Sequence, residues 1–198
     1  MEGDGRLNMT LLLTGERDQA LLALVIKEAR QIADENKRYV GRTAIQKIMY
    51  FLKARGIPMN YKFDIYHYGP YCQDIITDTD WLIVDDVIRD QSTKPDNYSN
   101  YAPYVSMDEI LEVISDLSSN ERDIIRDTVK ALIPLEPNLL ELLATLDYLL
   151  RAEKATGRKT EIKETVVKRL MEVKGAKFEQ NLVESMYDTV ARIGELGS

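Results

Sequence analysis

The chain has little of the side-chain chemistry from which enzyme active sites are built. Its 198 residues include one histidine, one cysteine and one tryptophan, namely His67, Cys72 and Trp81. A single cysteine excludes an intramolecular disulfide and fits a reducing compartment, so we expect a cytoplasmic protein. One histidine and one cysteine are too few for a structural zinc site. No glycine-rich phosphate-binding pattern occurs either, and we expect neither a metal nor a cofactor.

Long apolar runs are also missing. The longest are Leu11–Leu13 and Ala20–Ile26, which are far shorter than the ~20 residues of a membrane-spanning helix. The N-terminal sequence MEGDG is acidic and lacks the basic start of a secretory signal. We therefore expect no membrane association.

Positive charge is in deficit. Acidic residues number 33 and basic residues 26, which gives a formal net charge of −7. Such a chain repels polyanions on average, so nucleic acid is a poor default partner. With 44% hydrophobic residues the chain has enough apolar material for a globular core.

Hydrophobic periodicity predicts two helices in the first 56 residues. The first spans about 16–36, and the second follows Gly41, with Thr43 as a weak N-cap and Gly56 at its C-terminal end. The apolar residues of the second helix recur at i, i+3, i+4 and i+7, which indicates one buried face; they are Ile45, Ile48, Met49 and Leu52.

The following region predicts a strand, a third helix and a hairpin. Residues 61–68 carry strand-type side chains, Gly69 ends the strand, and Pro70 is expected in the first turn of the helix. The buried side of that helix is predicted to consist of Ile75, Ile76 and Trp81. Residues 84–88 and 98–105 flank a polar turn at 93–97 and are typical of a β-hairpin.

After residue 106 the pattern is helical throughout. A capping-box spacing begins at Ser106, a similar start signal begins at Ser119, and further helices are predicted at 139–155, 160–174 and 176–195. We therefore predict a mainly α protein with a small β component. A winged helix-turn-helix-like half (1–105) is followed by a helical half (106–198) that packs on it.

Catalysis is disfavoured by the few candidate groups. Cys72 lies five residues from His67 without a recognised catalytic spacing, and a buried structural cysteine is the more common case. Asp74 and Asp78 are four residues apart and could hold a hard cation. A solvated acidic face is more common, and we expect no enzyme activity.

DNA binding requires basic side chains where the fold presents a helix to the groove. Between residues 71 and 91, six aspartates face one base, Arg89, so the helix after Pro70 is not suited to DNA. The basic region is C-terminal and contains nine bases: Arg151, Lys154, Arg158, Lys159, Lys163, Lys168, Arg169, Lys174 and Lys177. It could dock an acidic partner or RNA, or be an ordinary solvated helix face.

Tyrosine is the residue in excess. Of the eleven tyrosines, several cluster on either side of the third predicted helix. Tyrosine is enriched at protein interfaces because it combines apolar area with a polar tip, although packing inside the fold is an equal alternative. The candidate partner surface consists of Tyr61, Tyr66, Tyr71, Tyr98, Tyr101 and Tyr104.

Two motifs in this region resemble those of a known family. The segment 44–52, AIQKIMYFL, resembles the "KLQKLLYF"-type helix of Panacea (SocA-like antitoxin) domains and of the related YwgA-like family. The segment 66–71, YHYGPY, resembles their "YGP" turn, about twenty residues later. The likeness covers about residues 38–105, and the Ala-Ile-Gln-Lys start is closer to the YwgA-like branch.

The resemblance implies a non-catalytic module that binds a protein partner, either a toxin or a protease substrate for which the module acts as an adaptor. Its motif residues in this chain are Gln46, Lys47, Tyr50, His67, Tyr68, Gly69 and Pro70. The first three are expected beside the buried stripe of their helix, and Gly69-Pro70 is expected to set a turn. The alternative is a winged-helix regulator that binds DNA through the C-terminal basic helices or as a dimer, and a homodimer is left open.

Overall fold

The computed structural model describes residues 17–92, 99–104, 112–157 and 161–195. The chain forms two compact units, each built from two stretches of sequence. The first contains Met1–Lys62 and Cys72–Leu135, and the second contains Phe63–Tyr71 and Glu136–Ser198. No helix in the described ranges is long and apolar enough to cross a bilayer.

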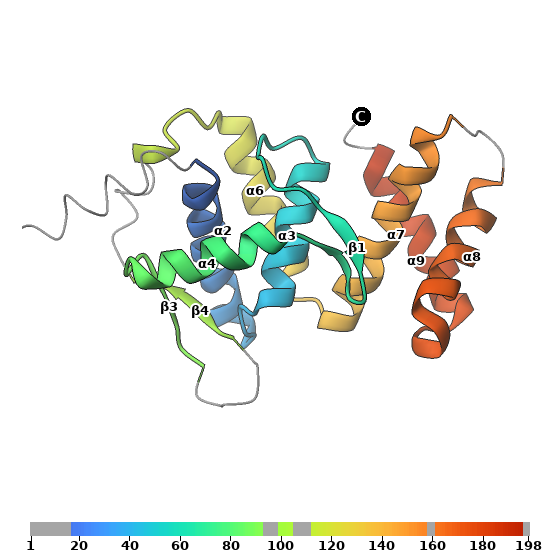
Figure 1. The fold of residues 1–198 in the computed structure, drawn as a ribbon, viewed down its shortest axis with the longest axis horizontal. Coiled ribbons are helices and arrows are strands. Elements are labelled where there is room, and N and C mark those ends of the chain that lie inside the picture. The colour runs from blue at the N-terminus through green and yellow to red at the C-terminus, as the bar shows by residue number, and fades with distance from the viewer. Residues whose placement is uncertain (1–16, 93–98, 105–111, 158–160, 196–198) are drawn as a thin grey trace, which may run out of the picture. The chain divides into compact units, whose positions relative to one another are not determined.

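The predicted fold class is confirmed, since the chain is mainly helical with two small antiparallel sheets. Figure 1 shows the elements along the chain. The first unit contains α2 (Arg17–Asn36), α3 (Arg42–Ala54), α4 (Gln73–Val84), β3 (Ile88–Asp90), β4 (Tyr101–Pro103) and α6 (Ser119–Leu132). The second contains β1 (Asp64–Tyr66), β2 (Gly69–Tyr71), α7 (Pro137–Ala155), α8 (Ile162–Lys174), η1 (Gly175–Lys177) and α9 (Gln180–Glu195).

These units are grouped differently from the predicted domains 1–105 and 106–198. Helix α6, which lies beyond residue 105, packs against α2 and α3 in the first unit. Its N-cap is Ser118, one residue before the predicted start, and Ser118 and Glu121 form a reciprocal capping box. The capping-box spacing that begins at Ser106 lies outside the described residues.

Helices α2 and α3 form as their periodicity predicts. Helix α3 ends in a Schellman motif, in which the N–H of Gly56 bonds the carbonyl of Lys53 and the N–H of Ile57 bonds the carbonyl of Leu52. Gly56 has φ +89°, so the predicted C-terminal glycine is in the left-handed conformation that favours glycine. The predicted N-cap Thr43 is wrong, because the helix already starts at Arg42 after Gly41.

The strand predicted at 61–68 is shorter than expected, and Pro70 does not begin a helix. Strand β1 pairs antiparallel with β2, with Tyr66 opposite Gly69 and Ile65 opposite Pro70. Gly69 has φ +83°, which lets the chain reverse direction after His67 and Tyr68. Pro70 therefore belongs to the return strand of a hairpin. Helix α4 starts only at Gln73, with Cys72 as its N-cap.

A buried side-chain amide fixes the start of α4. The Gln46 amide donates to the Cys72 carbonyl at 2.8 Å and accepts from the Cys72 N–H at 2.9 Å. Gln46 is buried, as are its neighbours Lys47 and Tyr50, so these motif residues lie within the core and not beside it. The two motif segments of the sequence are thus connected through the backbone that follows the YGP turn.

The set of buried residues on α4 differs from the prediction. Its buried residues are Ile75, Thr79 and Leu82, whereas the side chain of Trp81 is 55% exposed. The prediction that Trp81 is buried is wrong because Leu82, one position further, falls on the same side as Ile75 and Thr79. The buried side of α4 faces α2, against which the helix packs.

The second hairpin forms, but its first strand is displaced. Val84 is the last residue of α4, Asp86 adopts a left-handed φ of 56°, and β3 begins only at Ile88. Strand β3 pairs antiparallel with β4, with Arg89 opposite Ala102. Asp90 closes the described part of the hairpin by accepting from the N–H groups of Ser92 (2.9 Å) and Asn100 (2.8 Å).

The second unit is organised around α7, against which both α8 and α9 pack (Figure 1). Leucines recur along α7 at the spacing of a helix buried on a wide face. The core that they form includes Leu142, Leu146, Leu149, Leu150, Val166, Leu170, Phe178, Val183 and Val190.

Replacing the Gln46 amide is expected to destabilise the first unit. The Gln46→Ala variant leaves a buried N–H and a buried carbonyl of Cys72 without these partners, which lowers the free energy of unfolding by about 2–4 kcal/mol. Urea denaturation followed by circular dichroism measures the loss. Gln31→Ala is the matched control, because Gln31 is exposed on α2. Equal midpoints for the two variants would contradict a structural role for the amide.

Asp90 should make the stability of the hairpin depend on pH. Partial burial acts to raise the pKa of Asp90, but hydrogen bonds from Asn100 and Ser92 outweigh it and lower the pKa below its usual value. The stabilisation is therefore complete above the unfolded-state pKa of about 3.9 and is lost as the pH falls through the folded-state pKa.

The measurement compares thermal unfolding of the parent and of Asp90→Ala between neutral and acidic pH. The variant is expected to be about 1 kcal/mol less stable at neutral pH, and the difference should shrink below about pH 4. Asp127→Ala, at an exposed position of α6, should show no such convergence. A difference for Asp90→Ala that stays constant with pH would refute the assignment.

Candidate interaction surface on the β1–β2 hairpin

The structure separates the candidate tyrosines into two groups. Tyr61 and Tyr101 are only 2% and 1% exposed, and they are therefore removed from the predicted partner surface. Tyr66 and Tyr104 are exposed, and Tyr71 is half-buried. Tyr98 lies outside the described residues.

The two buried tyrosines have internal partners that account for their burial. The Tyr61 hydroxyl donates to Asp78 at 2.7 Å, and burial together with this bond raises the pKa of Tyr61 well above its usual value. The Tyr101 hydroxyl accepts from the Arg42 guanidinium at 3.0 Å. Sequence spacing does not distinguish these residues from surface tyrosines, because their partners lie on distant elements.

The β1–β2 hairpin carries two exposed tyrosines, Tyr66 of the candidate surface and the motif residue Tyr68. Tyr66 is 58% exposed and Tyr68, at the tip, is 67% exposed. The rings of Tyr66 and Tyr71 lie 5.3 Å apart in a tilted arrangement, which supports the orientation of Tyr66. All three residues of β1 are exposed, whereas Gly69 and Pro70 of β2 are buried. The hairpin therefore presents one strand and its tip outward.

A buried ion pair holds the tip of this hairpin on the helices of the second unit. The Lys174 ammonium lies 3.0 Å from Oε1 of Glu141, and both side chains are almost completely buried. The same ammonium donates to the backbone carbonyl of His67. Since a buried ammonium is stable only when its donors are satisfied, Lys174 requires both the carboxylate and the turn carbonyl.

A second lysine extends the arrangement to the surface. The Lys177 ammonium lies 2.6 Å from Oε2 of Glu141, so one carboxylate pairs with two lysines. Lys177 also lies over the rings of Tyr68 (5.3 Å) and Phe178 (5.5 Å). These contacts restrict Tyr68 while leaving most of its ring in solvent. We call Glu141, Lys174 and Lys177 the ion triad.

Like Glu141 of the ion triad, the other buried acids of α7 form ion pairs with basic side chains. Asp147 pairs with Arg151 at 2.7 Å, and buried Glu153 pairs with Arg169 at 3.0 Å. Two further bases are paired at the surface, Lys163 with Asp188 and Lys168 with Glu172. Six of the nine bases counted in the C-terminal basic region thus have an acidic partner, and Arg158 and Lys159 lie outside the described residues.

Sequence reasoning missed the ion triad, although a signal was present. Glu141, Asp147 and Glu153 interrupt a helix that is otherwise strongly apolar, and acids at such positions require bases elsewhere in the fold. The nine bases downstream are the obvious source. The pairing itself depends on how α7 and α8 pack, which the spacing of charges along one chain does not specify.

The other chemical candidates are separated or already engaged. Cys72 is buried at the start of α4 in the first unit, whereas His67 is exposed on the hairpin of the second. Asp78 accepts from Gln19 and Tyr61, so its two oxygens serve the core. Within the described ranges, no cluster of three His, Cys, Asp or Glu side chains is placed to hold a metal ion.

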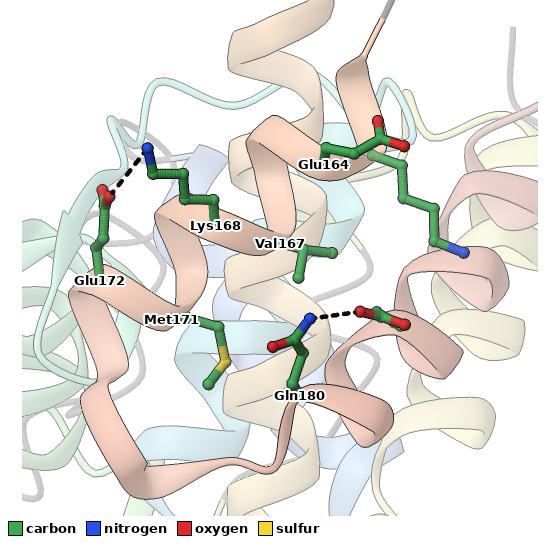
Figure 2. A pocket seen from close by; sticks show the side chains of 8 residues that line it. Glu164, Val167, Lys168, Met171, Glu172 and Gln180 are labelled. Carbon is green, nitrogen blue, oxygen red and sulfur yellow. Dashed lines mark hydrogen bonds and ion pairs between the residues drawn. The ribbon is translucent and has the colours of Figure 1, made fainter.

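A cavity of about 640 Å³ lies along α8 and α9. Figure 2 shows Val167 and Met171 on its apolar side, with charged residues of both signs around them. Lys168 pairs with Glu172, and the Gln180 amide donates to the Glu184 carboxylate at 2.8 Å. The cavity offers apolar surface without a converging set of catalytic groups.

The ion triad is expected to contribute strongly to stability through coupling between its members. Glu141→Leu leaves the buried Lys174 ammonium without its carboxylate and should lower the free energy of unfolding by about 3–5 kcal/mol. Lys174→Met leaves Glu141 paired with Lys177 alone and should cost less. The double variant should lose less than the sum of the two, by at least about 1 kcal/mol. Chemical denaturation of the four proteins measures this coupling.

A second cycle on the exposed pair Lys168 and Glu172 provides the control. These side chains are largely in solvent and 4.0 Å apart, so their coupling should be below about 1 kcal/mol. Additive losses at Glu141 and Lys174 would show that the two residues act independently.

Comparison of the sequence with protein-family models gives no match, and comparison with curated proteins gives none.

Proposed function

We propose that this chain is a non-catalytic protein-interaction module, antitoxin-like or adaptor-like, that binds a protein partner through the exposed tyrosines of the β1–β2 hairpin. The observation that carries the proposal is the exposure of Tyr66 and Tyr68 on a hairpin whose turn is held by the ion triad. Aromatic side chains are frequent binding hot spots, and an exposed pair on an anchored turn requires an explanation beyond stability.

Anchoring matters because ordering an interface costs free energy. Tyrosine has few rotatable bonds, and here the tip is already constrained by Lys174 at the His67 carbonyl and by Lys177 beneath Tyr68. A partner that binds this surface has less conformational entropy to remove than it would on a free loop. Burial of two tyrosine rings then contributes to affinity with a smaller entropic cost.

The two motif segments support the same proposal. The Gln46 bond to Cys72 gives the AIQK segment a structural role, and the buried Gly69-Pro70 pair sets the hairpin turn. The exposed side chains, Tyr66, His67 and Tyr68, come from the YHYGPY segment itself. We accordingly propose membership of the Panacea and YwgA-like group, with a cytoplasmic toxin-like protein or protease substrate as the partner.

The winged-helix DNA-binding alternative has less support. It requires bases that are available to phosphates, either on the C-terminal helices or across a dimer. Most bases of the C-terminal region instead pair with carboxylates of the same unit, and α4 contains aspartates and no base. The electrostatic contribution that dominates DNA binding is therefore weak on both elements.

The test is affinity purification of the tagged chain from its source cells, with quantitative identification of what is recovered. We expect one protein in stoichiometric amount, and its recovery should fall at least about tenfold for Tyr66→Ala/Tyr68→Ala. Circular dichroism should show an unchanged fold, because both rings are largely in solvent.

Tyr39→Ala is the matched control, since Tyr39 is exposed in the first unit. It makes the same chemical change in the other unit and should leave recovery unaltered. Recovery of the chain alone, or equal loss with the control, would contradict the proposal. A salt-dependent shift of promoter DNA would instead favour the regulator.

A further inference from the structure

Helix α4 presents large apolar side chains to solvent. Trp81 is 55% exposed and Val84, one turn further, is 69% exposed. Residues three apart on a helix are neighbours, so the two form a contiguous apolar patch. A tryptophan left in solvent forgoes a large burial free energy, and it is the residue type most enriched among binding hot spots.

The acidic residues near this patch come from α4 and its C-terminal end, and one of them, Asp80, also interacts electrostatically with Arg42 of α3. Helix α4 contains Asp74, Asp78 and Asp80 and no basic residue. Asp78 is engaged with Tyr61 and Gln19, whereas Asp74 and Asp80 are exposed. Asp80 is four residues before Val84, and Asp85 is four residues after Trp81, so these two acids are neighbours of the patch. The exposed side of the helix is thus both apolar and acidic.

The C-terminal end of α4 adds to this field. Asp85 is its C-cap residue and Asp86 follows directly in a left-handed conformation. The C-terminal end of a helix carries partial negative charge, so acids there strengthen the local negative potential instead of stabilising the helix. Asp86 occupies the left-handed position of a Schellman motif, which aspartate tolerates, and both acids add negative charge at the end of the helix, next to the exposed Val84. A cation at this point would relieve the repulsion.

We propose that the exposed side of α4, defined by Asp74, Asp80, Trp81, Val84, Asp85 and Asp86, docks a cationic amphipathic segment of a protein partner. An arginine of the partner stacks on the Trp81 indole and its guanidinium bonds the neighbouring carboxylates. An aliphatic side chain of the partner covers Val84. This surface is separate from the tyrosines of the β1–β2 hairpin and stands independently of the function proposed for them.

The negative charge of this surface disfavours two other binding partners, a second copy of the chain and nucleic acid. In a symmetric dimer through this side, two acidic surfaces would face each other across a two-fold axis, and the repulsion between like charges disfavours such an interface. Nucleic acid is repelled for the same reason. Arginine is favoured over lysine because its planar group both stacks on an aromatic ring and binds carboxylates through two donors.

The experiment uses the intrinsic fluorescence of the protein. Trp81 is the only tryptophan in the chain, so its emission reports directly on this surface. The probe is a short synthetic helical peptide that carries arginine and leucine along one side, and the control peptide has glutamate in place of arginine. The arginine peptide should shift the emission to shorter wavelength in a saturable manner and protect it from acrylamide quenching. The glutamate peptide should do neither.

Two pairs of variants separate specific docking from attraction by net charge. Asp80→Asn/Asp86→Asn should weaken the binding of the arginine peptide by about tenfold. Asp123→Asn/Asp127→Asn changes the net charge equally at exposed positions of α6 and should leave affinity unchanged. Equal weakening by both pairs, or no change in Trp81 emission, would overturn the proposal.

Two further outcomes are informative. A shift of the emission with protein concentration alone would assign the surface to a second copy of the chain and would also overturn the proposal. The Tyr66→Ala/Tyr68→Ala variant should bind the arginine peptide like the parent. If the Tyr66→Ala/Tyr68→Ala variant loses the cellular partner but still binds the peptide, the two surfaces act separately. If the parent protein fails to bind the peptide, the test of the hairpin tyrosines is unaffected.

Discussion

The second unit depends on the ion pairs that the buried Glu141 carboxylate forms with two lysines. This carboxylate is buried on α7 and pairs with Lys174 and Lys177, and Lys174 in turn bonds the turn carbonyl of His67. A segment from the first half of the chain is thereby fixed to the later helices α7 and α8, with Lys174 lying 107 residues beyond His67 in the sequence. Because a buried charge without a partner is costly, the carboxylate, the lysines and the turn must be present together. The exposed tyrosines owe their position to this requirement.

In the first unit, a buried neutral amide has the corresponding structural role. Where the chain returns from the hairpin, the Gln46 amide satisfies both backbone groups of Cys72. Helix α4 therefore starts at a defined point although its N-cap side chain makes no capping bond. The two motif segments thus maintain the architecture through buried groups, whereas contact with partners falls to their exposed neighbours.

The charged residues of the two units have different roles, which the net charge of the chain does not reveal. Most bases of the C-terminal region neutralise acids of α7, α8 and α9 and contribute to folding. The acids of α4 have no base on the same helix, and two further acids, Asp85 and Asp86, directly follow its C-terminal end. Both observations reduce attraction for nucleic acid. They also leave an acidic surface around Trp81, which is suited to a cationic protein segment.

Sequence alone determined the helices, the Gly56 terminus and the presence of a hairpin after α4, because these depend on local periodicity and backbone preference. Only the tertiary structure decided which side chains are buried. Trp81 is exposed, Tyr61 and Tyr101 are buried, and Lys174 pairs with Glu141, since each outcome depends on elements distant in the chain. Pro70 shows the same limit, because a proline suits both a helix start and a strand. Pairing with β1 made it a strand residue.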